Sequence, residues 1–298
     1  MDLIIESWDS QRGIIIAKHV EDRDTGFEKL KVRKIRASGI GRSCDAELFL
    51  SAAGVESQFD TKSLRIFEIG RVMEPVIARW MVEDGWELKH NDDDSLGMLM
   101  WAGAGIITGH FDVIGRHPKI TENEWALLDI KTMNTRRFNA WSKNGVQSSD
   151  PAYFAQLLFY GYAWKYKKLG LVGMEKPTGD YEVEIFDFDK KKFDELYDRA
   201  KQILDADLAM ASKDRKCDWC SKKESCEGTM TNPLPKIRDK KYLIDLVAHF
   251  YNAYKYTEEG NLIKLAPRYP LEKMLIPPDN IKFEKKEEPE FDDEWIIF

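Results

Sequence analysis

The chain lacks any long run of apolar residues. Its 298 residues are 43% hydrophobic, which is ordinary for a globular protein. No stretch reaches the roughly 18 consecutive apolar residues that a membrane-spanning helix requires. The opening segment, MDLIIESWDS, also lacks the basic-then-apolar order of a secretory signal. We therefore expect neither membrane insertion nor export, and a cytoplasmic location.

Cysteine is scarce as well, with four residues in the whole chain, too few for a secreted disulfide scaffold. Three of them lie within ten positions, in CDWCSKKESC (Cys217, Cys220 and Cys226), and Cys44 lies 173 residues upstream of Cys217. Four thiolates satisfy either an iron–sulfur cluster or Zn²⁺. Zinc sites more often use two Cys-x₂-Cys pairs, so the isolated Cys44 favours a cluster, with zinc and free thiols as the alternatives.

An excess of positive charge is missing too, since the net charge is −7. The segment 284–298, EKKEEPEFDDEWIIF, holds seven acids and two lysines and so accounts for −5, which leaves −2 for the rest. A nearly neutral body can still bind a polyanion through a local basic surface. Candidate basic segments are 31–36, 132–143 and 165–168, although a run of charge is most often a solvated face.

The order of predicted elements indicates an α/β fold. The chain has no internal repeat and no low-complexity linker before about residue 230. Apolar spacing, helix-start signals such as Asp150–Pro151, and alternating or β-branched runs predict helix, helix, strand, strand, helix, strand and helix. The segments in this order are 44–54, 62–84, 105–115, 124–133, 150–168, 181–188 and 190–212. We therefore expect a mixed central sheet flanked by helices.

Three regions divide the chain in this interpretation. Residues 1–230 form the main domain, 231–283 a C-terminal helical and extended extension, and 284–298 an acidic tail without fixed structure. In the extension, we expect one helix over 242–260 and an extended, proline-punctuated stretch over 266–280.

Two charged residues project from an apolar strand. In ALLDIKT the period of two places Leu127, Asp129 and Lys131 on one face, with Leu128 and Ile130 on the other. Burying an acid and a lysine costs several kcal/mol each unless they pair or hold a metal ion. A structural ion pair would suffice as an explanation for this strand taken alone.

A second acid, Asp112, lies in the preceding predicted strand, GHFDVIG. If the two strands are antiparallel neighbours, Asp112 and Asp129 converge. Two carboxylates in one place repel each other, and Mg²⁺ is a usual neutralising ion. The sequence therefore predicts a site of two acids and a lysine.

These motifs resemble the PD-(D/E)xK nuclease superfamily, with GHFD followed by LLDIKT. The RecB-like branch also has an acid or histidine on an earlier helix and Gln-x₃-Tyr on the following one. GRVMEPVIARW supplies Glu74, and YFAQLLFYGYAW supplies Gln156 and Tyr160, which share a helical face at i, i+4. The resemblance implies a restriction-endonuclease-like core and covers about residues 38 to 228.

The resemblance also implies roles. Asp112, Asp129, Glu74 and the backbone carbonyl of Ile130 would bind Mg²⁺ or Mn²⁺, and Lys131 would position or activate the attacking water. Gln156 and Tyr160 would contact the phosphate, with ordinary helix packing as the alternative. His110 either supports these ligands or is a packed core histidine. Some relatives have histidine where this chain has Glu74, which leaves the number of metal ions open.

The cysteine pattern is similar to that of iron–sulfur RecB-like nucleases, which include the AddB nuclease domain and CRISPR-adaptation nucleases. The resemblance implies a 4Fe–4S cluster held by the four cysteines. Closing a loop of 173 residues would stabilise the fold by roughly 4 to 5 kcal/mol on a disulfide-like estimate, so we expect a structural role. The tail resembles those of single-stranded-DNA-binding proteins. It would dock a protein partner through Trp295 to Phe298 or shield a basic surface, unless it only adds solubility.

Together these motifs predict a metal-dependent deoxyribonuclease, an exonuclease acting on single-stranded or unwound DNA ends. Short stand-alone nucleases of this kind are common in phages and CRISPR systems, which is an association and no physical argument. Two alternatives remain from the sequence. One is a non-catalytic DNA-binding or scaffold protein that keeps the fold, and the other is a zinc-stabilised nuclease acting on RNA.

Overall fold

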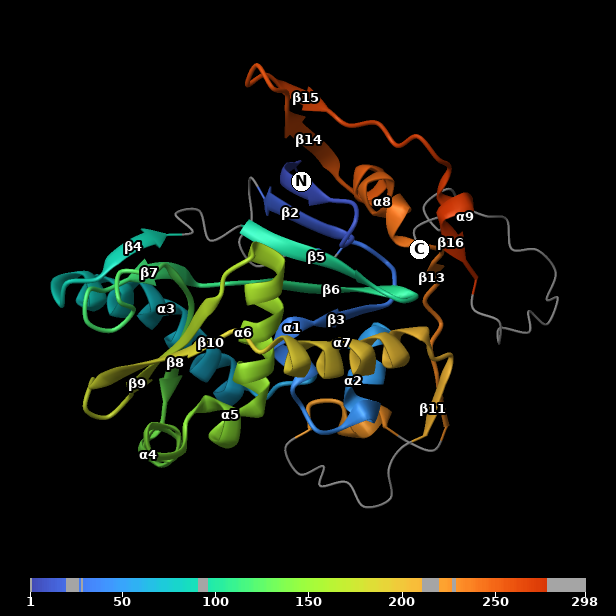
Figure 1. Ribbon diagram of the computed structural model, residues 1–298. Helices are drawn as coiled ribbons and strands as arrows, with labels where there is room; N and C mark the ends of the chain where they lie inside the picture. The colour runs from blue at the N-terminus through green and yellow to red at the C-terminus, as the bar shows by residue number, and fades with distance from the viewer. Residues whose placement is uncertain are drawn as a thin grey trace.

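The computed structural model describes residues 2–19, 27, 29–90, 96–210, 220–226 and 229–277. Two mixed sheets dominate the fold (Figure 1). The larger has seven strands in the order β15 (Leu262–Lys264), β14 (Asn252–Tyr256), β1 (Asp2–Asp9), β2 (Ile14–His19), β5 (Leu96–Ala102), β6 (Gly105–His110) and β3 (Lys34–Arg36). The smaller has five strands in the order β10 (Tyr181–Asp187), β9 (Lys168–Glu175), β8 (Ala126–Met133), β7 (Val113–Arg116) and β4 (Glu87–His90).

Helices and two short ribbons complete the described chain. The helices are α1 (Ala37–Ile40), α2 (Asp45–Ala52), α3 (Thr61–Glu83), α4 (Thr135–Asn144), α5 (Val146–Ser149), α6 (Pro151–Trp164), α7 (Lys190–Asp205), α8 (Leu243–Phe250), α9 (Leu271–Met274) and the 3₁₀ turns η1 (Lys223–Ser225) and η2 (Lys240–Tyr242). The ribbons pair β11 (Leu208–Met210) with β12 (Thr229–Thr231) and β13 (Lys236–Ile237) with β16 (Leu275–Ile276). The predicted α/β class, with a mixed sheet flanked by helices, is confirmed.

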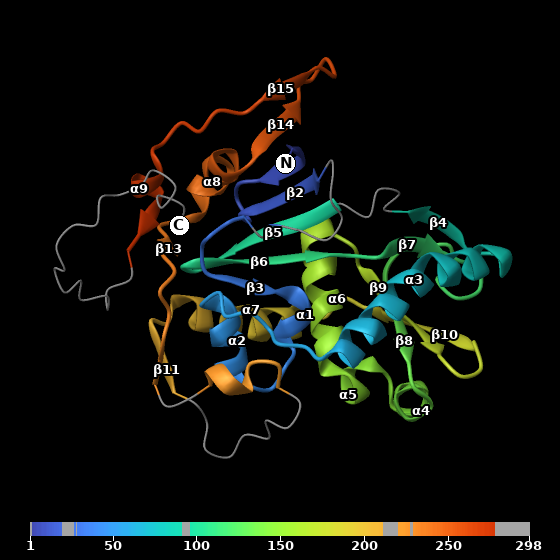
Figure 2. The same ribbon diagram turned by 180° about the vertical axis from the view of Figure 1, so that it is seen from behind.

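The two faces of the five-stranded sheet are covered by different helices. Helix α6 lies over the face seen in Figure 1, and α3 lies over the face seen in Figure 2. The alternation of β8 matches this arrangement. Leu127 belongs to the core under α6, whereas Leu128 and Ile130 pack with Ile77 of α3. Asp129 and Lys131 share the face of Leu127, so the sequence correctly predicts the side from which they project.

Local signals fix where the main helices begin and end. The side chain of Asp60 accepts a 2.7 Å hydrogen bond from the amide of Ser63 and so caps α3. Helix α6 begins at Pro151, whose fixed φ suits the first helical turn, and ends where Lys165 adopts a left-handed conformation. Asp150 is the N-cap residue as predicted, although its side chain makes no capping bond there.

Several predicted elements differ from the observed ones. The predicted strand 105–115 is two strands, β6 in the larger sheet and β7 in the smaller, with Phe111 and Asp112 between them. A continuous β-branched run carries no local signal for such a change of sheet. The predicted helix over 242–260 ends at Phe250, and β14 follows it.

The C-terminal segment is part of the main fold. Strand β14 pairs in parallel with β1, with Asp2 opposite Asn252 and Ile5 opposite Lys255. Strands β14 and β15 therefore share a sheet with the N-terminal strand β1. No helix in the part of the chain that the structure describes is long and apolar enough to span a membrane. The tail, 284–298, lies outside the described residues.

Candidate active site

Asp112 and Asp129 meet at the point where β7 and β8 stop pairing. The antiparallel register ends with Val113 opposite Leu128, so the next step along both strands places Asp112 opposite Asp129. Oδ2 of Asp112 accepts a 2.7 Å hydrogen bond from the amide of Ile130. The two carboxylates that the sequence singles out therefore converge, as an antiparallel pairing requires.

The ammonium group of Lys131 lies among three oxygen atoms. Its Nζ is 2.6 Å from Oδ2 of Asp129 and 3.5 Å from Oδ2 of Asp112, and it donates a 3.1 Å hydrogen bond to the carbonyl of Ile130. The side chain of Asp129 is fully buried, while those of Asp112 and Lys131 are 20% and 21% exposed. The cluster therefore opens to solvent on the side of Asp112 and Lys131.

Gln156 and Tyr160 complete the buried side of the cluster. Nε2 of Gln156 donates a 2.8 Å hydrogen bond to Oδ1 of Asp129 and lies 3.1 Å from the hydroxyl of Tyr160. Among the described residues, Oε1 of Gln156 has no hydrogen-bond partner. The Tyr160 ring packs so closely on β6 that a Cβ at Gly109 would lie 2.6 Å from it. The i, i+4 pair therefore holds Asp129 in place from α6.

The environment shifts the pKa values of these groups. Burial raises the pKa of Asp129 to about 7, although the charge of Lys131 opposes the shift. For Lys131, burial disfavours the ammonium ion, but the carboxylates of Asp112 and Asp129 outweigh it, so its pKa lies well above the ordinary value. Burial also raises the pKa of Tyr160. At neutral pH, Lys131 and Tyr160 are therefore protonated, and burial favours the neutral form of Asp129 while the charge of Lys131 favours its carboxylate.

Tyr153 and Arg137 extend the cluster toward solvent. The Tyr153 ring centroid lies 5.5 Å from Nζ of Lys131 and 4.5 Å from the guanidinium carbon of Arg137. Arg137 in turn donates a 2.6 Å hydrogen bond to Oδ2 of Asp150. The sequence interpretation includes Arg137 within a basic segment but misses Tyr153. Its position three residues before Gln156, on the same side of α6, is the signal that could have identified it.

Glu74 and His110 are the two remaining predicted residues. Glu74 is half-buried on α3, the helix on the opposite face of the sheet. His110 pairs with Gly97 across β5 and β6, and a Cβ at Gly97 would lie 2.6 Å from its Nε2. Burial and the charge of Arg36 lower the pKa of His110, while the charge of Asp112 opposes the shift. The role of His110, as a support for the ligands or as a packed core histidine, stays a prediction.

The donor set fits a hard divalent cation, because Mg²⁺ and Mn²⁺ prefer carboxylate and carbonyl oxygens. The Asp112 carboxylate, the Asp129 carboxylate and the Ile130 carbonyl already converge on one positive charge, the Lys131 ammonium. Within the described ranges, however, no three side chains of the types His, Cys, Asp and Glu gather closely enough to hold a metal ion. The predicted ligand set that adds Glu74 to the two aspartates stays a prediction.

The cysteine segment lies against the connection between α2 and α3. The amide of Gln58 donates a 2.8 Å hydrogen bond to the carbonyl of Ser221, and Lys222 donates to the carbonyl of Val55. Cys44 packs at the edge of the core that contains the buried Cys226. Cys217 lies outside the described residues, so the predicted four-cysteine site stays a prediction.

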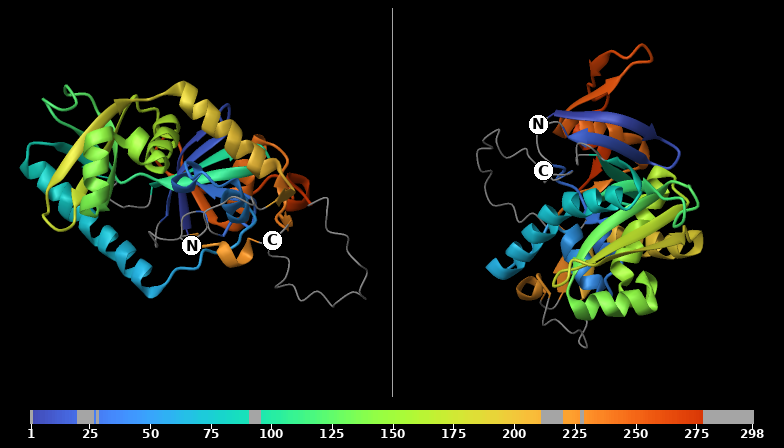
Figure 3. Two further views of the ribbon diagram at one scale, coloured as in Figure 1. Left: turned by 90° about the horizontal axis from the view of Figure 1, so that it is seen from below. Right: turned by 90° about the vertical axis from the view of Figure 1, so that its left-hand side faces the viewer.

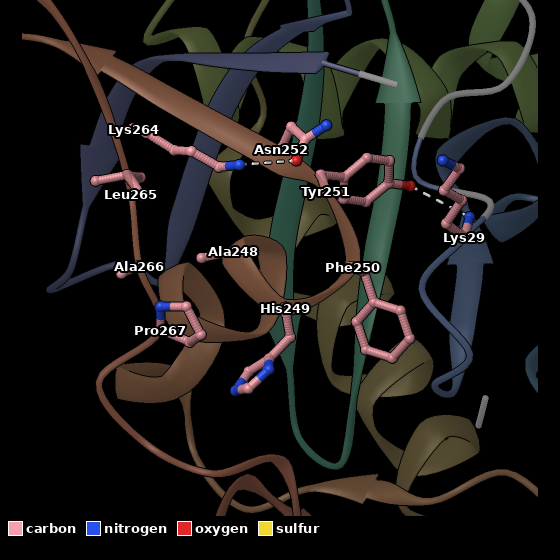
Figure 4. A pocket seen from close by; sticks show the side chains of 10 residues that line it. All are labelled: Lys29, Ala248, His249, Phe250, Tyr251, Asn252, Lys264, Leu265, Ala266 and Pro267. Atoms are coloured by element: carbon pink, nitrogen blue, oxygen red, sulfur yellow. Dashed lines mark hydrogen bonds between the residues drawn. The ribbon is translucent and has the colours of Figure 1, made fainter. Parts of the chain in front are cut away.

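A pocket lies elsewhere in the molecule. Its volume is about 490 Å³, and Figure 4 shows it bordered by α8, β14 and the chain that follows β15. Lys264 donates a 3.1 Å hydrogen bond to Asn252 at one side, and the amide of Lys29 donates to the Tyr251 hydroxyl at 3.2 Å at the other. None of the predicted site residues lines this pocket.

Comparison with known proteins gives distant matches among solved structures. No family model matches the chain, and no curated protein does. Among solved structures, an alkaline exonuclease from Laribacter hongkongensis is 16% identical with a TM-score of 0.41, covering 59% of this chain and 90% of its own. The same enzyme in complex with dAMP is 16% identical with a TM-score of 0.42, and the match covers 59% of this chain and 88% of its own. The protein SSO0001 is 14% identical with a TM-score of 0.40, and the match covers 72% of this chain and 91% of its own. These likenesses are too distant to assign a function.

Proposed function

We propose that the chain is a metal-dependent deoxyribonuclease that hydrolyses phosphodiester bonds, acting as an exonuclease on single-stranded or unwound DNA ends. The observation that carries the proposal is the convergence of two carboxylates and a backbone carbonyl on the ammonium of Lys131. A structural ion pair needs one acid for one lysine. A second acid and a carbonyl at the same point form a set of oxygen ligands suited to a divalent cation.

In this proposal Asp112, Asp129 and the Ile130 carbonyl hold Mg²⁺ or Mn²⁺. When bound, the ion supplies charge neutralisation at the phosphate and lowers the pKa of a water molecule. Lys131, whose raised pKa keeps it protonated, donates hydrogen bonds to the water or to a phosphate oxygen. Gln156 fixes the rotamer of Asp129 through the 2.8 Å hydrogen bond, so that the carboxylate need not change its orientation when the cation binds.

Charge near the end of β8 supports a polyanionic substrate. Helix α4 follows β8 after one residue and carries the exposed side chains of Arg136, Arg137 and Lys143, with no acid. Such a local basic surface attracts nucleic acid although the chain as a whole is acidic. The substrate phosphate would therefore approach from the exposed side of Lys131.

The test is hydrolysis of end-labelled single- and double-stranded DNA with Mg²⁺, with Mn²⁺ and with EDTA. We expect cleavage in metal only, and a loss of roughly hundredfold or more in rate for Asp129→Ala and Lys131→Ala, as for groups that stabilise the transition state. Lys255→Ala is the matched control, because Lys255 is exposed on β14 and remote from α4.

Two outcomes would contradict the proposal. Metal-independent cleavage, or variants as active as the original chain, would exclude this mechanism. Binding without cleavage under all metal conditions would favour the non-catalytic alternative. An RNA oligonucleotide of the same sequence tests the remaining alternative, since faster cleavage of RNA than of DNA would replace the assigned substrate.

A further inference from the structure

The N-terminal half of α3 exposes large apolar side chains that its sequence pattern leads one to expect inside. In its C-terminal half, the face toward the sheet buries Ile77 and Met81 completely. The same face continues toward the N-terminus, where Ile66 is 41% exposed and Phe67 is 52% exposed. In Figure 3 this part of α3 projects away from the rest of the chain. The apolar face of α3 therefore extends beyond the edge of the sheet, and its N-terminal part is left uncovered.

This exposed face begins beside the end of β8. Phe67, Gly70 and Glu74 share one side of α3, because residues three and four apart are neighbours on a helix. A Cβ at Gly70 would lie 3.7 Å from Oγ1 of Thr132, the residue that follows Lys131. Seven residues separate Phe67 from Glu74, which is about 10 Å along the helix axis.

The exposed apolar side chains include an aromatic pair. Phe59, 44% exposed, packs edge to face on Phe67, with ring centroids 5.0 Å apart. Unpaired bases stack on such rings regardless of sequence, because every base has a π-face. Two phenylalanines held together with half of their surface open are therefore suited to receive bases.

The segment that holds the aromatic pair has a small excess of positive charge. Residues 59–72 carry three exposed cations, Lys62, Arg65 and Arg71, against two exposed acids, Asp60 and Glu68. A groove for single-stranded nucleic acid combines positive charge with aromatic rings. The cations therefore favour a nucleic acid over an apolar protein partner on this face.

We propose that the Phe59–Phe67 pair binds bases of an unpaired DNA strand. The proposal rests on the proposed function, because it takes the substrate to be DNA. The site therefore selects unpaired strands, since a base within a duplex has no free π-face for the rings.

The test measures binding of a fluorescent single-stranded 12-mer to the full chain in EDTA, by anisotropy. We expect the double variant Phe59→Ala/Phe67→Ala to bind roughly ten- to a hundredfold more weakly, as for the loss of base stacking. Phe67→Trp, which keeps an aromatic ring at this position, should bind as tightly as the original chain. The matched control is Ile69→Ala/Val72→Ala, which removes side chains of similar exposure from the other side of α3 and should bind normally.

A second measurement separates stacking from a general effect on the helix. Oligonucleotides with abasic positions should bind the original chain more weakly, whereas the double alanine variant should not distinguish them from the intact strand. The inference would be overturned if all variants bound the oligonucleotide equally, or if abasic positions weakened binding by the same factor in the original chain and in the double alanine variant.

Failure of this inference is distinguishable from failure of the proposed function. If the original chain cleaves DNA but the phenylalanine variants bind normally, only the base-binding role is wrong. If binding depends on the phenylalanines and no metal gives cleavage, the proposed function is wrong and the binding surface stands.

Discussion

Replacing Asp129 by asparagine should remove a specific pH dependence of stability. Asparagine has nearly the same shape and can still accept the hydrogen bond from Gln156 that is 2.8 Å long in the original chain. It cannot ionise. The change therefore isolates the charge of one fully buried carboxyl group.

The direction and size of the pH effect on the free energy of unfolding follow from the pKa of Asp129, which burial raises from 3.8 to about 7. A carboxyl whose pKa is higher in the folded chain binds its proton more tightly when folded. Stability is then highest below the unfolded pKa and falls as pH rises toward the folded pKa. Each pH unit in this window contributes up to about 1.4 kcal/mol, so between pH 5 and 7 the free energy of unfolding should fall by about 2 to 3 kcal/mol.

The assay is thermal unfolding in EDTA at pH 5, 6, 7 and 8. The Tm of the original chain should fall by roughly 4 to 8 °C more than that of Asp129→Asn over this range. Asp187→Asn, at a side chain that is 77% exposed, is the matched control and should follow the original chain. Adding Mg²⁺ at pH 8 should raise the Tm of the original chain and leave that of Asp129→Asn nearly unchanged. Parallel pH profiles for the two proteins would refute the assigned electrostatics.

Three further predictions concern other parts of the molecule. Gln156→Leu removes the hydrogen bond to Asp129 and should lower kcat more than it raises KM, with a loss of about 1 to 3 kcal/mol in unfolding free energy; unchanged kinetics would contradict the positioning role. Anaerobic purification should give a brown protein with broad absorbance near about 400 nm that is lost in Cys44→Ala, whereas a colourless protein with stoichiometric zinc would exclude an iron–sulfur cluster. Deleting 284–298 should raise DNA affinity or abolish capture of a protein partner; if neither changes, the tail has no such role.

Much of the candidate site follows from short-range patterns. The period of two on β8 puts Asp129 and Lys131 on one face, and the i, i+4 spacing on α6 puts Gln156 and Tyr160 together. Both relations hold in the structure, since Gln156 contacts Asp129 and Tyr160 directly. They depend only on the geometry of a strand and a helix, which neighbouring residues set by themselves.

Other features depend on which segments pack together. The passage of β6 into β7 across two sheets and the pairing of β14 with β1 involve contacts between segments that local sequence does not encode. The same holds for α3, whose apolar pattern predicts burial along its whole length. Its N-terminal half stays exposed because the sheet ends beneath it.

The sequence by itself determined the identity of the chemical groups and their local spacing: two aspartates, a lysine and a glutamine–tyrosine pair on elements of known period. Tertiary structure alone decided that Asp112 stands opposite Asp129, because the register of β7 on β8 is set by packing on both faces of the sheet. It also decided that Glu74 approaches from the opposite face and that the phenylalanines of α3 remain open to solvent. Periodicity fixes the direction of a side chain from its own backbone, while the partner it meets depends on the rest of the chain.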